Sequence, residues 1–403
     1  MLTKTELNKY VDVLIWGLET SRFSTGGKYE KGDIVAIFYD LGSLSLAEIL
    51  HKKLLQKGLN VIMRMKNTSK IEFDFFDIAS DDQLKFLAPW DKIFYNNLNG
   101  SIYLSAPFSL THLKGISPRK LTIPSKVRKP LQEITNKREQ EGKFGWTLCL
   151  LPTQALADYA GMSLKQYARE IVKACYLDKK NPVSIWKSLS RKVENIKKWL
   201  NGLDIEYLHI ESKNINLKIR LGEKRKWLGV SGHNIPSFEI FTSPDWRGAE
   251  GRYYANVPEF KSGNSAKGIR LLFKDGRVTK VSAREGEKFV KKQIKMDKGA
   301  SQIGEISFTD KRFSPIRKYM ASGLYDENVG GKYGNCHMAL GRSFADAYTG
   351  DQKKLDKKLK EKLGFNNSAL HWDLINTENK KVTAHLKSGE KVVIYENGIF
   401  VNS

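Results

Sequence analysis

The pattern of apolar residues along the chain changes near Gly202, and this change constrains the fold more than any other feature of the sequence. Before Gly202, apolar strand-like runs alternate with segments whose apolar residues recur at helical spacing. After it, short β-branched or alternating stretches dominate. At 403 residues the chain also exceeds what one hydrophobic core usually organises. We therefore predict an α/β fold of two domains: an N-terminal α/β domain with a largely parallel sheet (1–202) and a β-rich α+β catalytic domain (203–403).

The first half contains the pattern of a strand–helix–strand unit. A β-type apolar run, GDIVAIFYD, starts at Gly32, and SLSLAEILHKKLLQKG then repeats apolar residues at helical spacing up to Gly58. The run NVIMRM, residues 60–65, predicts a second strand. Two strands joined by a helix form a βαβ unit, which builds a parallel sheet. No GxGxxG motif or P-loop lies at the first turn, so nothing here predicts nucleotide binding.

The second half carries turn signals and one amphipathic segment. Asp275-Gly276 and Asn397-Gly398 each lie between strand-like runs and predict two β-hairpins. The segment DQKKLDKKLKEKLG spaces three leucines four residues apart and predicts a helix with a solvated basic face.

Acids and histidines interrupt the apolar runs of the second half. In His371-Trp372-Asp373, side chains two residues apart along a strand point to the same face, so the histidine and the aspartate could bind one ion while the tryptophan packs in the core. Glu239 and Glu305 lie inside the apolar stretches NIPSFEIFTSP and IGEISF. A buried acid needs a metal, a cationic partner or a turn toward water.

Two further candidates, Glu327 and His337, lie in the glycine-rich stretch ENVGGKYGNCHMALG, which Glu327 begins. Together with the other acids and histidines they offer the oxygen and nitrogen ligands that borderline divalent ions accept. Other interpretations stay open for each residue. Glu239 and Glu305 could be acids on solvated edge strands, Glu327 a turn residue, and His337 a hydrogen-bonded core histidine.

The order and spacing of five blocks, NIPSFEIFTSP, GEISF, YDEN, GNCHMALG and HWDLI, resemble the M29 family of metallo-aminopeptidases, the aminopeptidase T family. A weaker resemblance extends into the first half through VDVLIWGLE, GDIVAIFYDLGSLSLAEIL and GWTLCLLPT. The resemblance as a whole implies a homodimeric enzyme that uses two divalent ions (Zn, Co, Mn or Mg) to remove N-terminal residues from peptides. It also implies a set of metal ligands, with Glu305 as the bridging carboxylate: Glu239, Glu305, Glu327, His337, His371 and Asp373.

Two positions depart from the family pattern. Residues 330–334 are extra between YDEN and the histidine, which makes Glu327 the least secure ligand. Many members carry a catalytic tyrosine seven residues after the histidine, where this chain has Phe344. Tyr348 lies four residues further on and would share a helix face with Phe344 if the segment were helical, so it is our candidate replacement.

The expected chemistry follows from general principles. Two metal ions about 4 Å apart lower the pKa of a shared water and polarise the scissile carbonyl. A nearby carboxylate, Glu305 or Glu327, would transfer the proton to the leaving amine. The chain contains no HExxH motif and no GxSxG elbow, so neither a helix-borne zinc protease nor a serine hydrolase is expected.

The formal net charge of +24 suggests a different class of function. So basic a chain invites a nucleic-acid or membrane-surface hypothesis. However, the lysines are scattered through nearly every segment, and no signature of a nucleic-acid-binding fold accompanies them. The alternative to the enzyme is a catalytically impaired, aminopeptidase-like basic protein that binds nucleic acid or acidic peptides.

The sequence also predicts a cytoplasmic protein. No apolar run is long enough to span a bilayer, and the first residues lack the pattern of a secretory signal. Its three cysteines, Cys149, Cys175 and Cys336, are too scattered for a disulfide framework or a four-cysteine zinc site. Cys336 adjoins His337, but we expect it to pack rather than to bind metal.

Overall fold

The computed structural model describes residues 2–261 and 264–402. The chain forms two compact units, which are described separately. The first comprises residues 1–186 and 231–236, and the second comprises residues 187–230 and 237–403. The second unit thus begins within the helix α10 (Pro182–Gly202). The functional boundary at Gly202 stays a prediction.

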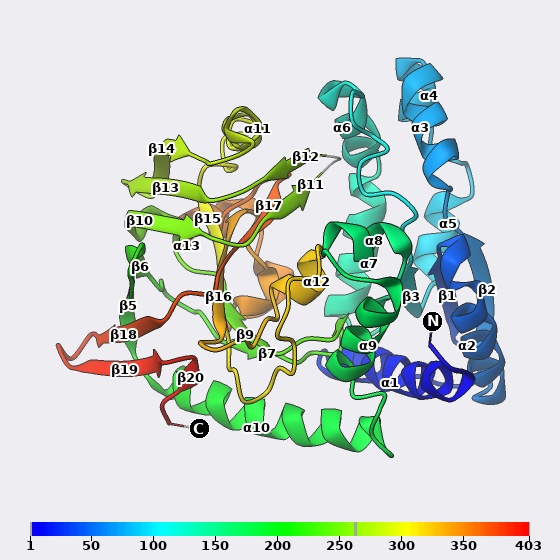
Figure 1. Cartoon of the computed structure of the whole chain (residues 1–403), viewed down its shortest axis with the longest axis horizontal. Coiled ribbons are helices and arrows are strands. Elements are labelled where there is room, and N and C mark those ends of the chain that lie inside the picture. The colour runs from blue at the N-terminus through cyan, green and yellow to red at the C-terminus, as the bar shows by residue number, and fades with distance from the viewer. Residues whose placement is uncertain (1, 262–263, 403) are drawn as a thin grey trace. The chain divides into compact units, whose positions relative to one another are not determined.

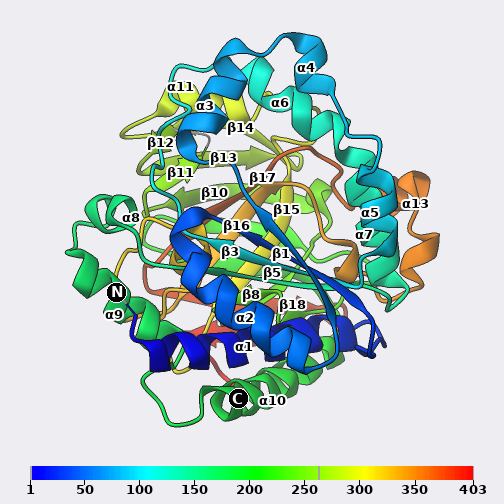
Figure 2. The same ribbon diagram turned by 90° about the vertical axis from the view of Figure 1, so that its right-hand side faces the viewer.

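A parallel sheet organises the first unit (Figure 2). Its strands, in the order β2-β1-β3-β4-β8, are Asn60–Met65, Ile34–Tyr39, Gly100–Ser105, Gly145–Leu150 and Asn234–Ile235. The helix α2 (Leu44–Gln56) connects β1 to β2, so the predicted βαβ unit is confirmed. The short β8 comes from a segment beyond residue 202 that returns to pair with β4.

Helices cover the parallel sheet because its strands are apolar on both faces. The helix α1 begins with a capping box, in which Thr3 and Glu6 satisfy each other's backbone N–H groups, and it packs against β4 and α2. The remaining helices that lie wholly in this unit are η1 (Leu41–Ser43), α3 (Ser69–Ile78), α4 (Asp81–Lys85), α5 (Asp91–Asn97), α6 (Pro118–Val127), α7 (Lys129–Gln140), α8 (Gln154–Tyr159) and α9 (Leu164–Ala174); α1 spans Lys4–Phe23.

Two antiparallel sheets form the second unit (Figure 1). The large sheet has the order β14-β13-β10-β6-β5-β18-β19-β20, with strands at Arg277–Ser282, Ile269–Lys274, Ala249–Ala255, Asn216–Arg220, Ile205–Ser212, Lys380–Leu386, Lys391–Glu396 and Ile399–Phe400. Both predicted hairpins are confirmed. Asp275 and Gly276 have φ of 51° and 74°, and Asn397 and Gly398 have φ of 52° and 84°, as a type I′ turn requires.

The small sheet has the order β17-β16-β15-β9-β7, with strands at His371–Asn376, Asn335–Gly341, Ile303–Thr309, Glu239–Thr242 and Leu228–Gly229. The even-numbered residues at the centres of β15, β16 and β17 form an apolar face: Ile306, Phe308, Met338, Leu340, Trp372 and Leu374. On this face the Phe308 ring lies 5.3 Å from the Tyr395 ring of the large sheet, between centroids, and 6.2 Å from the Trp227 ring. The second unit therefore has its core between the two sheets.

Short elements complete the second unit. They are η2 (Trp246–Gly248), β11 (Glu259–Lys261), β12 (Asn264–Ala266), α11 (Glu287–Gln293), α12 (Gly323–Asp326), η3 (Ala345–Ala347), η4 (Gln352–Lys354) and α13 (Lys357–Leu363). The predicted amphipathic helix is thus present as α13, and it begins at Lys357 because the Asp356 side chain accepts from the Leu359 N–H and caps it. Among the described residues, no helix is both long and apolar enough to cross a bilayer.

We expect Phe308→Ala to lower the free energy of unfolding by about 3–5 kcal/mol, because Phe308 is fully buried between the sheets and its removal leaves a cavity. Phe308→Leu, which keeps most of the volume, should cost less. Urea unfolding followed by tryptophan fluorescence measures both. A loss below about 1 kcal/mol for the alanine variant would show that the core does not lie here.

Candidate metal centre

The two acids inside apolar strands are buried in the interior of the small sheet. Glu239 on β9 is 8% exposed, and Glu305 on β15 is 3% exposed. In the strand order, β15 lies between β16 and β9, and β9 lies between β15 and β7. The alternative interpretation, in which these acids lie on solvated edge strands, is therefore wrong.

Strand register brings four distant segments together on one face of the small sheet. Because side chains alternate, the odd-numbered residues of β15, β16 and β17 share the face opposite the apolar core. On this face Ala339 pairs with Glu305 on one side and with Asp373 on the other. The neighbouring pair joins Gly341 to His371, and Gly341 has a φ of 101° at a point where a Cβ would collide with a backbone carbonyl.

Glu305 lies between two imidazoles. Its Oε1 is 3.1 Å from Nε2 of His337, and its Oε2 is 3.7 Å from Nε2 of His371. Glu239 Oε2 lies 3.4 Å from the first imidazole, and Asp373 Oδ1 lies 3.4 Å from the second. Two groups of three ligand atoms result, each within 4.8 Å, and they share Glu305: Glu239, Glu305 and His337; Glu305, His371 and Asp373.

The orientation of His371 leaves Nε2 free to bind a cation. Its Nδ1 lies 2.9 Å from the carbonyl oxygen of Arg342, which can only accept, so Nδ1–H is the donor and Nε2 carries the lone pair in the neutral ring. That lone pair faces the carboxylates of Glu305 and Asp373. Acceptors that face each other across less than 4 Å need a proton or a metal ion between them.

His337 is the most enclosed member of the cluster. It is 1% exposed, and its Nε2 lies within 4 Å of three carboxylates, Glu239, Glu305 and Asp373. A single N–H satisfies one of them at most. Its Nδ1 has no hydrogen-bond partner among the described residues. The neighbouring Cys336 points to the apolar face, where it contacts Tyr253, so it packs as expected.

Burial and mutual repulsion set the ionisation of the acids. Burial, with help from other acids, raises the pKa of Glu239 to about 7 and that of Glu327 well above its usual value. Burial opposes ionisation of Asp373 too, but the two imidazoles outweigh it and lower the pKa of this carboxyl.

The pKa values of both imidazoles are raised, because nearby carboxylates favour the charged rings. Burial disfavours the charged form of His337, but Glu305, Asp373 and Glu239 outweigh it and raise the pKa well above the usual value. The pKa of His371 is raised in the same way, against burial, mainly by Asp373. The cluster is thus an electronegative site that attracts cations.

Glu327 belongs to neither group of three. It is 8% exposed and follows the short helix α12, whose last turn it caps. Its carboxyl lies near the cluster, since the charges of Glu239, Asp373, His337 and Glu305 all act on its pKa. The structure therefore brings five predicted ligands into two close groups and the sixth beside them. The assignment of all six as metal ligands remains a prediction.

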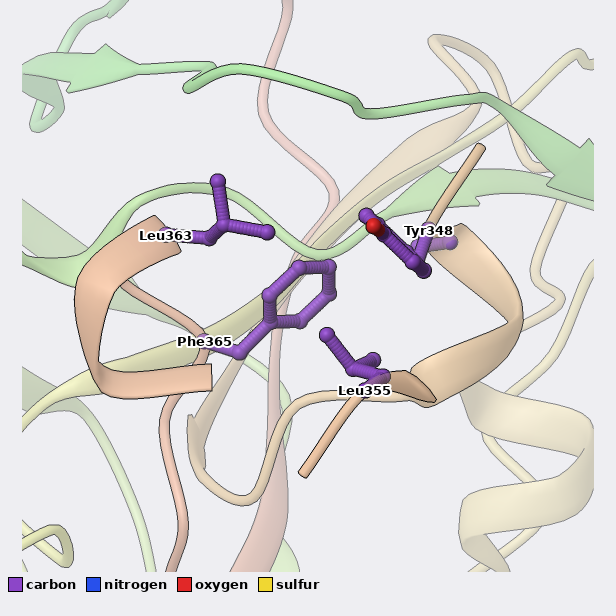
Figure 3. Close-up of a cluster of buried hydrophobic side chains, with 5 residues drawn as sticks. Tyr348, Leu355, Leu363 and Phe365 are labelled. Atoms are coloured by element: carbon purple, nitrogen blue, oxygen red, sulfur yellow. The ribbon is translucent and has the colours of Figure 1, made fainter. Parts of the chain in front are cut away.

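Phe344 and Tyr348 lie in different surroundings. The Phe344 ring is 4.8 Å from the His371 ring, between centroids, and backbone at Phe344 and Tyr348 is extended, with only the 3₁₀ turn η3 between them. The helix that would have aligned them is absent. Tyr348 is 5% exposed and packs with Leu355, Leu363 and Phe365, as Figure 3 shows. In the described part of the chain, Tyr348 makes no recorded contact with a predicted ligand.

Sequence reasoning missed several polar residues near the cluster. Lys261 donates from Nζ to the His371 carbonyl oxygen at 2.7 Å, and Glu259 precedes it by two residues on β11. Asp326 and Tyr319 lie in the segment before Glu327. Asp326 belongs to the YDEN block, but nothing in that block distinguishes it from Glu327 as a site residue. For Glu259 and Lys261 the available signal was the charged alternation Glu259-Phe260-Lys261, and Tyr319 had none.

The donor set fits divalent cations. Carboxylate oxygens and imidazole nitrogens are the ligands that zinc, cobalt and manganese accept, and two groups that share one carboxylate match a two-ion site. Unbalanced buried carboxylates are otherwise costly. The residues present therefore fit a metal, as the sequence predicted.

Comparison with known proteins identifies the family. The model of the thermophilic metalloprotease (M29) family matches residues 3–400, so the chain belongs to this family and the predicted resemblance is confirmed. Aminopeptidase PepS of Streptococcus thermophilus is 25% identical over an alignment of 428 residues, and the alignment covers 99% of this chain and 98% of that protein. Aminopeptidase AmpS of Bacillus subtilis (strain 168) is 24% identical over 419 residues, 98% of each. The chain is therefore a peptidase, a hydrolase of peptide bonds.

A solved structure shows the same fold. Wild-type AmpT from Thermus thermophilus superposes with a TM-score of 0.77 at 21% identity, covering 96% of this chain and 99% of that one. The predicted α/β fold class is confirmed.

Ala339→Leu should lower the affinity for Zn²⁺ on the order of 10- to 100-fold, because Ala339 lies between Glu305 and Asp373 and a larger side chain would fill the space between them. Competition with a fluorescent chelator measures the affinity. Ala339→Ser, which stays small, is the control and should bind nearly as tightly as wild type. Equal affinities for all three proteins would place the metal elsewhere.

Proposed function

We propose that this member of the M29 family is a metal-dependent aminopeptidase that removes N-terminal residues from peptides with two divalent cations. One observation carries the proposal. The two oxygens of Glu305 face different imidazoles, Oε1 toward His337 and Oε2 toward His371. A carboxylate in this position can bridge two ions. The relatives described above are aminopeptidases, which supports the exopeptidase class.

Two cations held there would supply Lewis-acid activation of a water molecule and of the scissile carbonyl. The residues of the chain provide the rest. Glu239 and His337 would hold one cation, His371 and Asp373 the other, and Glu305 both. The Arg342 carbonyl fixes the ring of His371, so its Nε2 keeps a constant direction.

Proton transfer to the leaving amine needs a carboxyl that is not fully engaged by cations. Glu305 and Glu327 are the two candidates. Glu305 offers both oxygens to the two groups, whereas Glu327 belongs to neither group, so its carboxyl is the freer of the two. Phe344, beside His371, has no proton to give. We therefore expect carboxylates to carry out general acid–base catalysis.

The nucleic-acid or acidic-peptide binding protein remains the alternative, since the net charge is +24 and Phe344 lacks a hydroxyl. Binding of nucleic acid that weakens steeply with salt, without peptide hydrolysis, would support it. The homodimer and the cytoplasmic location stay predictions.

The decisive variant is Glu305→Gln. Wild-type protein should contain about two divalent ions per chain, as a two-metal mechanism requires, and the variant should lose both metal and hydrolysis of N-terminal residues. Elemental analysis and release of leucine from short peptides measure the two quantities. Glu390→Gln changes an exposed acid and serves as the matched control. A fully active, metal-replete Glu305→Gln protein would contradict the bridging role.

Tyr348→Phe tests the tyrosine predicted from the sequence. We expect hydrolysis within about twofold of wild type, because Tyr348 packs in an apolar cluster. General acid–base catalysis contributes about 100-fold or more. A kcat reduced by that factor, with unchanged metal content and thermal stability, would establish Tyr348 as catalytic after all.

A further inference from the structure

The strand β11 lies against the end of β17 that carries two predicted ligands. Lys261 Nζ donates to the carbonyl oxygen of His371 at 2.7 Å. Glu259 is two residues earlier on the same strand, so its side chain points to the same face as that of Lys261. The carboxyl of Glu259 is therefore directed toward the metal centre.

One oxygen of this carboxyl is buried without a hydrogen-bond partner among the described residues. Glu259 is 7% exposed, its Oε1 is enclosed, and no described residue forms a hydrogen bond with that atom. Burial raises the pKa of Glu259 well above its usual value, and the nearby charges of Asp326 and Asp373 raise it further. Lys261 acts on it only from a distance, because no ion pair joins the two side chains among the described residues. A native protein rarely leaves a buried carboxyl unsatisfied unless a ligand completes the site.

A second unsatisfied group lies nearby. The hydroxyl oxygen of Tyr319 is enclosed and has no hydrogen-bond partner in the described residues. Burial raises the pKa of Tyr319, and Asp326 and Glu259 add to this effect, so the hydroxyl lies near both acids. Asp326 holds the turn that follows Tyr319, because its oxygens accept from the N–H groups of Met320 and Ser322 at 2.7 and 2.8 Å.

We infer that Glu259 and Tyr319 form a subsite for a cationic nitrogen of the substrate's N-terminal residue. The inference rests on the proposed aminopeptidase function. Both free oxygens can accept hydrogen bonds from an ammonium or guanidinium group. Asp326 adds a further carboxyl near both groups. A cationic nitrogen would offset the burial that disfavours the ionised Glu259 carboxyl, which a neutral water would not do.

Two parts of a peptide carry such a nitrogen: the free α-amine and the side chain of an N-terminal lysine or arginine. The selectivity of the enzyme among peptides distinguishes these two possibilities. Loss of an α-amine contact lowers kcat/KM for every peptide alike, whereas loss of a side-chain contact lowers it for lysyl and arginyl peptides only.

The test compares wild type with Glu259→Gln, which keeps the shape and removes the charge. The metal-loaded proteins are assayed on lysyl, leucyl and glutamyl dipeptides. We expect kcat/KM to fall about 10- to 100-fold, either for all three peptides or for the lysyl one alone, because the hydrogen bond from the cationic nitrogen loses its charged acceptor. Metal content should not change. Glu285→Gln, which changes an exposed acid between β14 and α11, is the matched control. Unchanged kcat/KM for all peptides would overturn the inference and leave only a buried water.

Calorimetry gives a measurement without turnover. L-lysinamide should bind wild type more tightly than Glu259→Gln, and L-leucinamide should do so as well if the subsite takes the α-amine. Equal affinities of the two proteins for both amines would overturn the inference. If wild type binds these amines through Glu259 but hydrolyses no peptide, the proposed function fails and the subsite stands. Should Glu259→Gln not fold, Tyr319→Phe removes a single oxygen and must weaken binding of the same amines, or the subsite is refuted.

Discussion

The strands of the small sheet bury apolar side chains on one face and carboxylates on the other, and every feature of the metal centre depends on this division. Packing of Phe308 and its neighbours against the large sheet supplies the stabilisation that holds the strands in register. The same register forces Glu239, Glu305 and Asp373 toward one another around His337. Repulsion between buried acids is costly unless cations balance it, so this face of the sheet suits the binding of divalent ions.

Small residues keep the polar face open. Ala339 leaves space between two acids, and Gly341 allows the chain to approach the backbone before His371 closely. Around this opening the chain places groups with different tasks. Glu305 and its neighbours would bind the cations, Glu327 lies beside them without joining either group, and Glu259 with Tyr319 would orient the substrate. In this proposal, catalysis and substrate recognition would use residues on separate strands and loops of one unit.

Sequence alone predicted the local structure well where a period or a turn signal exists. The βαβ unit, both hairpins and the shared face of His371 and Asp373 follow from periods of 3.6 and 2 and from Asp-Gly and Asn-Gly pairs. What it did not predict depends on pairing between distant segments. The return of β8 to the parallel sheet has no local signal, and neither does the position of Glu259 beside β17. The prediction of Tyr348 as the catalytic tyrosine depends on its spacing of four residues from Phe344. Such spacing aligns two side chains only within a regular helix, which this segment does not form.

The proposed function depends most on the position of Glu305 between two cations. Anomalous X-ray diffraction from crystals of the zinc- or cobalt-loaded protein, recorded at the metal absorption edge, tests this position directly. We expect two anomalous peaks, one between Glu305 and the Glu239–His337 pair and the other between Glu305 and the His371–Asp373 pair. Absence of both peaks, or peaks only at surface residues away from Glu305, would contradict it.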